Sequence, residues 1–219
     1  MTDPTATPAQ LFVWTDIDPA HEDDFNAWYD REHMAERVAI PGMLWARRYR
    51  ARDAGARRYL AIYRAESLGT FTSDAYRAAF TRQTDWSNRN FARMTNTQRR
   101  VMAVAGEAGA GAGGAVALVE LDGDTLPPAR LPDIGARPGV LRVQMLVPDA
   151  DLSTPLPSET DQPRVLRPVL LADTTGGAGA DDLCRALADE MGGQARSALA
   201  FDLIWSLDAA DLTAARGRG

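Results

Sequence analysis

The chain of 219 residues contains no lysine, because all 24 of its basic residues are arginine. A lysine Schiff base and a phosphate-binding loop that ends in lysine are therefore excluded. One cysteine, Cys184, cannot form an internal disulfide, and it fits the reducing cytoplasm, where we expect this protein. With only His21 and His33 beside that cysteine, we expect no protein-built metal site.

Long apolar runs and a basic stripe are also missing. No segment approaches the roughly 20 apolar residues that span a bilayer, and the start MTDPTATPAQ has no signal-peptide pattern. The net charge is −6, with 15 arginines against 13 acids in residues 1–105 and 9 against 17 in residues 106–219. We therefore expect neither a membrane nor a nucleic acid as partner.

The two halves of the chain carry the same order of expected elements. Pro-Gly-x-Leu heads an apolar strand at Pro41 and again at Pro138. The other matched segments are strands at 11–17 and 115–121, strands at 58–65 and 164–172, helices at 73–80 and 180–191, and strands at 99–105 and 201–207. The first half therefore follows the β-α-β-β-α-β order of a ferredoxin-like unit, and the second half follows it except for a doubtful first helix.

This repeat predicts an α+β protein of two ferredoxin-like units in tandem. We place the first unit at 1–105, a flexible Gly/Ala linker at 106–114 and a degenerate second unit at 115–219. The linker contains a formal G-x-G-x-x-G, but a strand follows it, so we expect no dinucleotide site. Three prolines in 122–137 predict a loop or one short turn in place of a helix. Residues 149–163 are typical of a mobile surface loop.

The best specified element is a helix that precedes Pro41-Gly42. Asp18 is a suitable N-cap and Pro19 suits the first helical position. Acids follow in the first turn, where the helix dipole favours negative charge. Pro41 and Gly42 end the helix.

The run FNAWYDREHMAERVAIPGMLWARRY, residues 25–49, resembles the helix-to-strand segment of the EthD-like branch of the dimeric α/β-barrel superfamily. The match is carried by Trp28-Tyr29, Glu32-His33, Pro41-Gly42 and Arg47-Arg48-Tyr49. This resemblance implies antiparallel sheets packed face to face, here as a pseudo-symmetric barrel within one chain. It also implies a pocket between sheet and helices. Many members of the superfamily work without a cofactor, and others have no known reaction.

Four residues of the helix are candidates for that pocket. On a helix, Tyr29 and His33 share one face, and Trp28 and Glu32 form the adjoining row. His33 has a pKa suited to proton transfer, and Glu36 together with the helix C-terminus favours its protonated form. Tyr29 offers a hydrogen bond to an oxyanion, and Trp28 a wall for an apolar substrate. The alternative is that these side chains only fill the core.

Strand candidates follow the helix. Alternation along 43–50 puts Trp45 and Arg47 on one face and Arg48 on the other, and the pattern leaves open which face lines the pocket. We choose Arg48 as the residue that binds an anionic group of the substrate. The alternative is that Arg48 pairs with a carboxylate of the helix, Glu32 or Glu36. Tyr63, on the next strand, is a further candidate for substrate contact.

Both histidines and all five tyrosines lie in the first unit, which we therefore expect to carry the site. The leading hypothesis is a cofactor-independent acid/base enzyme, an isomerase, cyclase, dehydratase or decarboxylase, acting on a small, largely apolar, anionic or aromatic molecule. His33 is the expected acid or base, with Tyr29 and Arg48 also catalytic. The substrate-binding residues are then Trp28, Glu32, Trp45, Arg47 and Tyr63. The alternatives are a non-catalytic ligand-binding or assembly protein and a cofactor-free monooxygenase. We expect a homodimer.

Overall fold

The computed structural model describes residues 7–53, 55, 57–156, 159 and 164–216. Eight strands close into a barrel in the order β1-β3-β2-β8-β5-β7-β6-β4, and every neighbouring pair is antiparallel. The strands are β1 (Ala9–Ile17), β2 (Met43–Ala51), β3 (Tyr59–Ala65), β4 (Met94–Gly109), β5 (Ala115–Leu121), β6 (Val140–Pro148), β7 (Val169–Thr174) and β8 (Ala195–Asp208).

The barrel consists of two four-stranded sheets with equivalent strand orders. The first unit has the order β4-β1-β3-β2 and the second has β8-β5-β7-β6. Two seams join the sheets, β2 to β8 through pairs such as Arg48 and Trp205, and β4 to β6 through pairs such as Ala103 and Val147. The predicted tandem of ferredoxin-like units in an α+β barrel is therefore confirmed.

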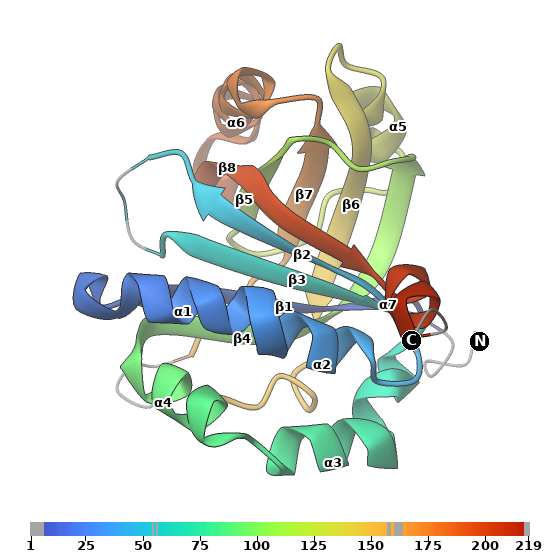
Figure 1. Ribbon diagram of the computed structural model, residues 1–219. Coiled ribbons are helices and arrows are strands. Elements are labelled where there is room, and N and C mark those ends of the chain that lie inside the picture. The colour runs from blue at the N-terminus through green and yellow to red at the C-terminus, as the bar shows by residue number, and fades with distance from the viewer. Residues whose placement is uncertain (1–6, 54, 56, 157–158, 160–163, 217–219) are drawn as a thin grey trace.

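Helices cover the outside of the barrel, as Figure 1 shows. An almost continuous helix crosses the first sheet, α3 and α4 lie below it, and α5 and α6 cover the second sheet. The helices are α1 (Glu22–Trp28), a π-helical segment (Tyr29–His33), α2 (Met34–Val38), α3 (Asp74–Thr81), α4 (Asp85–Arg93), α5 (Arg130–Gly135), α6 (Gly177–Met191) and α7 (Ala209–Arg216). Short 3-10 turns precede α1 (Pro19–His21) and α3 (Leu68–Thr72) and follow α6 (Gly192–Gln194).

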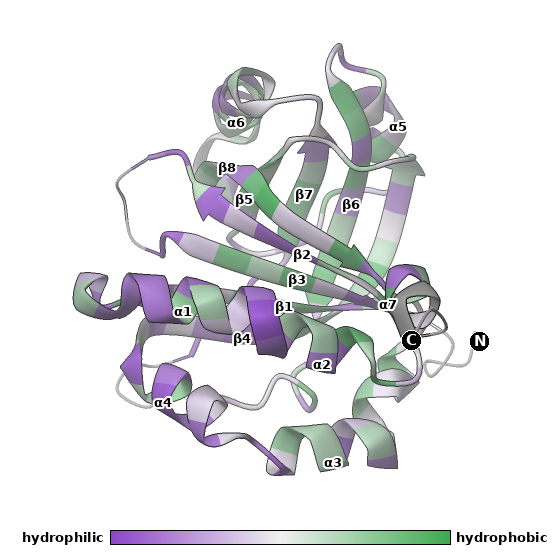
Figure 2. Cartoon of the chain, in the orientation of Figure 1, coloured by the Kyte–Doolittle hydropathy of each residue, from purple (hydrophilic) through white to green (hydrophobic). Residues whose placement is uncertain are grey.

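Strand alternation produces three separate cores. Residues such as Phe12, Trp14 and Phe201 fill the barrel interior. The outward residues of the first sheet, among them Tyr63, pack against α1–α4, and those of the second sheet pack against α5 and α6. In Figure 2 hydrophobic positions run along the strands, while hydrophilic and hydrophobic segments alternate along the helix from α1 to α2. Because the first sheet is apolar on both faces, its outer face can wall a pocket under the helices.

The predicted linker 106–114 is shorter than expected. Its first four residues continue β4 and pair with β6, as Gly106 does with Met145. The glycines are needed for close approach, because a Cβ on Gly113 would come within 1.7 Å of the Thr174 carbonyl oxygen. Gly109 has φ +82°, a conformation that favours glycine. The glycines therefore form the end of β4 and let the chain pass close to the Thr174 carbonyl.

The loop predicted as mobile, 149–163, is anchored by buried side chains where it is described. Ser153, Leu156 and Glu159 are each at most 9% exposed. Ser153 donates to the Val101 carbonyl, and Glu159 accepts from the Arg99 backbone. Residues 157–158 and 160–163 lie outside the described part. Through these hydrogen bonds the segment holds the second unit against β4 of the first unit. The polar composition of the segment gave no indication of these contacts.

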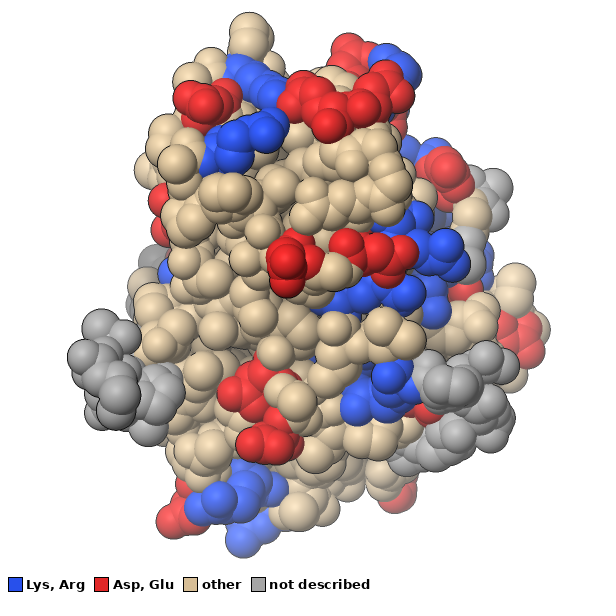
Figure 3. All heavy atoms as spheres, turned by 180° about the vertical axis from the view of Figure 1, so that it is seen from behind, with Lys and Arg blue, Asp and Glu red and all other residues tan. Residues whose placement is uncertain are grey.

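The short α5 agrees with the predicted loss of a long helix in 122–137, and α4 was not predicted at all. Seen from behind in Figure 3, arginines lie beside acidic side chains in mixed groups, and much of that face is uncharged. Among the described helices, none has the length and apolar character needed to cross a membrane.

Candidate functional site

A cavity of about 330 Å³ lies between the first sheet and the helices that cover it. Its wall comes from β1, β3, β4, the helix from Tyr29 to Arg37, α3 and α4, together with one residue of the second unit, Leu156. The lining residues are Leu11, Val13, Tyr29, His33, Arg37, Tyr63, Tyr76, Phe80, Gln83, Asn88, Phe91, Ala92, Met94, Arg99 and Leu156. The cavity is therefore mostly apolar and aromatic, with a few hydroxyl, amide and basic groups.

The helix changes its geometry where it meets the cavity. Residues 29–33 form a π-helical turn between α1 and α2. Such widened turns are rare and occur mostly as local bulges, frequently at functional sites. Both ends of this turn, Tyr29 and His33, line the cavity. The local distortion therefore coincides with the two residues predicted to do chemistry.

His33 is enclosed by aromatic rings. It stacks on Trp28 with centroids 4.2 Å apart, and meets Tyr29, Phe91 and Tyr63 edge-on at 5.3, 5.6 and 6.3 Å. The side chain is only 6% exposed, and its Nδ1 has no hydrogen-bond partner among the described residues. The ring is thus held rigidly while one polar atom stays unsatisfied.

The charge state of His33 differs from the predicted imidazolium. Burial holds the pKa of His33 well below its usual value, and the positive charges of Arg37 and Arg48 lower it further. These effects exceed those of Glu36 and the helix end, on which the prediction relied. His33 is therefore neutral at pH 7 and available to accept a proton.

Tyr29 and Tyr63 stand beside the imidazole with their hydroxyls protonated. Burial raises the pKa of Tyr29, and it raises the pKa of Tyr63 well above the ordinary range. The Tyr63 hydroxyl is buried and has no hydrogen-bond partner in the part of the chain described. The two side chains are therefore suited to donate hydrogen bonds to an acceptor in the cavity.

Arg48, predicted as catalytic, is not among the lining residues. Its guanidinium is enclosed by the rings of Phe25, Tyr29 and Tyr59, at 5.0, 4.1 and 4.7 Å from their centroids. Nη2 donates to Asn26 Oδ1 at 2.7 Å, and the whole residue is 1% exposed. Arg48 therefore supports Tyr29 from behind and does not reach the space where a ligand would lie.

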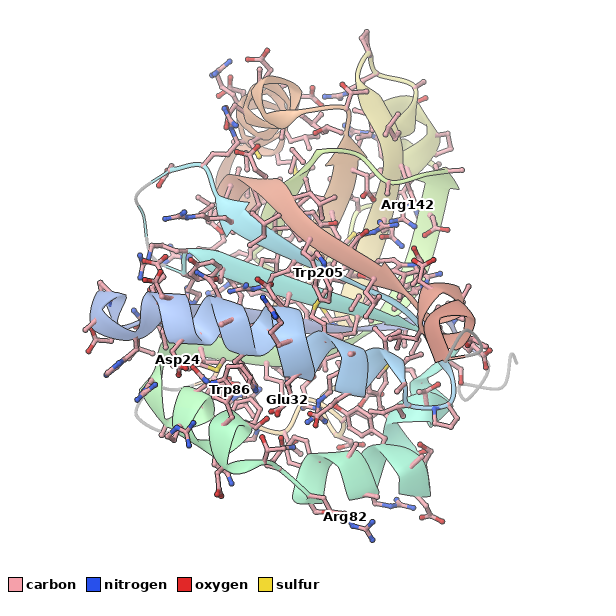
Figure 4. The ribbon with its side chains drawn as sticks, in the orientation of Figure 1. Asp24, Glu32, Arg82, Trp86, Arg142 and Trp205 are labelled. Atoms are coloured by element: carbon pink, nitrogen blue, oxygen red, sulfur yellow. The ribbon has the colours of Figure 1, made fainter. Side chains whose placement is uncertain are left out.

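Trp28 and Glu32 join the helix to α4. The Trp28 indole donates to Ser87 Oγ at 3.0 Å, and Glu32 accepts from Thr84 at 2.6 Å and from Ser87 at 3.2 Å. Thr84 is itself the N-cap of α4. Figure 4 shows Asp24, Glu32 and Trp86 in the space between α1 and α4. Neither residue lines the cavity: Trp28 packs behind the lining rings of Tyr29, His33 and Phe91, and Glu32 bonds to α4.

Trp45 and Arg47 face the interior of the barrel. Arg47 lies 4.0 Å from the Trp45 ring centroid and 3.4 Å from Asp173, which also accepts from Arg142 at 2.8 Å. The open question of strand facing is thus answered: Arg48 points toward the helices, and Arg47 points inward. Of the eight predicted site residues, Tyr29, His33 and Tyr63 line the cavity.

Sequence reasoning missed Arg37, Arg99 and Tyr76. Arg37 was within reach, because it follows Tyr29 and His33 at the same four-residue spacing on one helix face. Arg99 and Tyr76 come from β4 and α3, far apart in sequence, and Arg99 Nη2 donates to the Tyr76 hydroxyl at 3.0 Å. Only the fold brings that pair to the cavity.

No protein-family profile and no curated protein sequence matches the chain. Solved structures do match it. A "putative monooxygenase" from Lactobacillus acidophilus has a TM-score of 0.53 at 11% identity, covering 93% of this chain and 97% of its own. An anthrone oxidase-like protein has 0.57 at 7% identity, covering 93% and 94%. This chain has the fold of these proteins.

A third match is a "putative chlorite dismutase", with a TM-score of 0.54 at 9% identity, covering 95% of this chain and 98% of its own. All three similarities extend over both units, which places the whole chain in the ferredoxin-like dimeric α/β-barrel fold. Among the described residues, no group of three or more histidine, cysteine or acidic side chains is arranged to hold a metal ion.

Proposed function

We propose that this protein is a small-molecule enzyme in which neutral His33 acts as general base on a largely apolar substrate. The observation that carries the proposal is the geometry of His33: a neutral imidazole with an unsatisfied ring nitrogen, on the wall of an apolar cavity. Buried polar atoms are normally paired, and exceptions call for an explanation. A substrate that presents an acidic C–H or O–H to the ring would supply one.

In the proposed reaction, His33 takes a proton from a carbon next to a carbonyl group. The electron pair of the broken C–H bond moves onto the carbonyl oxygen, which becomes an enolate. Tyr29 and Tyr63 donate hydrogen bonds to that oxygen, and the aromatic walls exclude water. The proton then returns to another atom, or a leaving group departs. This sequence fits the isomerase, cyclase, dehydratase and decarboxylase classes that the EthD-like resemblance suggests, without a cofactor.

Anthrone is a suitable test compound, because it is an apolar aromatic ketone with an acidic CH₂ group. Under argon in D₂O, the protein is expected to accelerate exchange of the CH₂ protons for deuterium, followed by NMR. His21→Gln should behave as the wild type, since the exchange is assigned to His33. If the wild type exchanged the CH₂ protons no faster than His33→Gln does, the proposal would be contradicted. A ligand-binding protein without catalysis would then be favoured.

A cofactor-free monooxygenase or oxidase is the second candidate, favoured by the names of two matched structures. After deprotonation, the anion of anthrone would pass electrons to O₂, giving anthraquinone and water from one anthrone and one O₂. Oxygen uptake in air, with anthraquinone formed in equal amount, would select this reaction. Exchange without oxygen uptake would select the acid/base classes.

Tyr29→Phe is expected to lower the exchange rate by about 10-fold or less, because one of two hydroxyl donors is lost and the ring is kept. Tyr63→Phe should have a similar effect, and the double variant a larger one. The rate constant from the same NMR experiment measures this. If both single variants and the double variant kept the exchange rate of the wild type, the tyrosines would have no part in the mechanism.

We also propose that the protein is a cytoplasmic homodimer that associates through surfaces other than the barrel seams. The two seams already join the sheets within one chain, so a second copy has to use the outer helices or loops. Light scattering tests this directly, and a monomer mass would contradict it.

A further inference from the structure

Three lining side chains of the cavity keep a buried polar atom that has no hydrogen-bond partner among the described residues. These atoms are His33 Nδ1, Tyr63 Oη and Arg37 Nε. Leaving a buried polar group unpaired costs about 1–3 kcal/mol. Three such atoms belong to residues that line one cavity, so the protein itself leaves polar groups at this site without partners.

Arg37 is the most unusual of the three. It is 5% exposed, and its guanidinium has one hydrogen bond, from Nη2 to Gln83 Oε1 at 3.0 Å. Within the described residues no carboxylate lies within 4.0 Å of it. Two other buried arginines have an acidic side chain nearby: Arg100 pairs with Glu159 at 2.8 Å, and Arg48 lies 3.9 Å from Asp30. A buried cation with only a neutral partner lacks charge compensation.

The rest of the cavity also has positive charge without an acidic partner. Arg99, across the cavity in β4, directs its guanidinium to neutral acceptors, namely the carbonyls of Leu152 and Thr154 and the hydroxyl of Tyr76. None of the described lining residues is an aspartate or a glutamate. The cavity therefore combines apolar walls with two guanidinium groups and no lining acid, which is suited to a negative ligand.

We propose that the cavity binds an apolar molecule bearing one anionic group, a carboxylate or a phenolate, and that Arg37 is the charge partner of that group. Leu11, Val13, Phe80 and Phe91 then enclose the apolar part. This proposal deepens the proposed function and rests on it, since it takes the cavity as the substrate site. It replaces Arg48, whose guanidinium is enclosed by rings, with Arg37 as the anchor.

The position of Arg37 also couples binding to the base. Arg37 lies one helical turn after His33, and side chains at this spacing are about 5–6 Å apart at their Cβ atoms. An anion at Arg37 offsets the positive charge that lowers the pKa of His33. Binding of the ligand is therefore expected to raise the pKa of His33 and make it a stronger base.

The test uses 2-naphthoate and 2-naphthamide, which share shape and ring but differ in charge. Isothermal titration calorimetry of the wild type should give at least roughly 10-fold tighter binding of the naphthoate, as expected for hydrogen bonds to charged groups. Arg37→Met should weaken naphthoate binding by roughly 10- to 100-fold and change naphthamide binding by less than about 3-fold.

Two control variants separate charge from structure. Arg82→Met removes an exposed arginine that follows α3 and does not line the cavity; Figure 4 shows it projecting outward from the molecule, so both affinities should stay unchanged. Gln83→Leu removes the hydrogen-bond partner of Arg37 but keeps the guanidinium, so the preference for naphthoate should persist. If Gln83→Leu abolished the preference as Arg37→Met does, the effect would come from the helix contact and the proposal would be wrong.

The remaining outcomes are also decisive. Equal binding of both compounds by the wild type, or no binding of either at millimolar concentration, overturns the proposal. If Arg37→Met does not fold, Arg37→Lys, which keeps the charge, must retain the naphthoate preference. Naphthoate has no acidic C–H, so its binding is independent of turnover. Naphthoate binding without anthrone exchange would therefore remove the proposed function alone, and exchange without naphthoate preference would remove the anion site alone.

Discussion

His33→Gln is expected to lower the rate of anthrone proton exchange by roughly 10²–10⁴-fold, the usual contribution of a positioned general base. Glutamine has similar volume and keeps a polar group among the surrounding rings, but it cannot accept a proton near neutral pH. The rate constant is measured by NMR in D₂O, and the fold is checked by circular dichroism and by denaturant unfolding. Turnover retained in this variant would remove His33 from the mechanism.

The pH dependence carries a second expectation for the same residue. Because the folded-state pKa of His33 is well below 6.5, the free base persists as the pH falls from 7 through 6. The exchange rate should therefore stay flat across this range and fall only at lower pH. A rate that halves near pH 6.5 would mean that the imidazole titrates as an exposed histidine does.

The lowered pKa of His33 also determines how this residue makes the stability depend on pH. Between the folded pKa and about 6.5 the unfolded chain binds a proton at this position that the folded chain does not. The free energy of unfolding therefore decreases as the pH falls below 6.5. Carboxylates contribute in the same acid range, so the comparison is with His33→Gln, whose loss should be less steep. His21→Gln, at the other histidine, is the matched control for the substitution itself.

The sequence was most informative where periodicity is local. Their spacing alone places Tyr29 and His33 on one helix face. The same spacing indicates Arg37, which was not among the predicted site residues. The contacts of Trp28 and Glu32 with Thr84 and Ser87 were not expected, because α4 was not predicted. Asp85-Trp86-Ser87-Asn88 offers weak helical periodicity, and nothing local reveals that Thr84 and Ser87 bond to Glu32.

Strand facing and protonation state required the fold. The alternation of Arg47 and Arg48 was clear, but the covered side of the sheet depends on long-range packing. Asp173, which decides that Arg47 points inward, is 126 residues away in the chain. The charge on His33 depends on burial and on Arg48, from another element, so Glu36 alone gave the wrong sign. Leu156 reaches the cavity from the second unit, a contact without any local signature.

Asp173→Ala is expected to destabilise the protein by about 3–5 kcal/mol, the usual cost of removing one partner of a buried ion pair. Asp173 is 1% exposed and bonds Arg142 at 2.8 and 3.0 Å and Arg47 at 3.4 Å. Its loss leaves two guanidiniums in the barrel with less compensation. Urea unfolding measures the change, and Asp202→Ala, in an exposed pair with Arg52, should destabilise the protein much less.

A double variant identifies the cause of that loss. Adding Arg142→Met to Asp173→Ala removes one uncompensated charge, so the double variant should be more stable than Asp173→Ala alone. If lost packing were responsible, the second change would add to the damage. Naphthoate affinity of the folded Asp173→Ala protein should equal that of the wild type, because Arg47 and Asp173 face the barrel interior and the cavity lies on the other side of the sheet. A large loss of affinity would return Arg47 to the ligand site, where the sequence first suggested it.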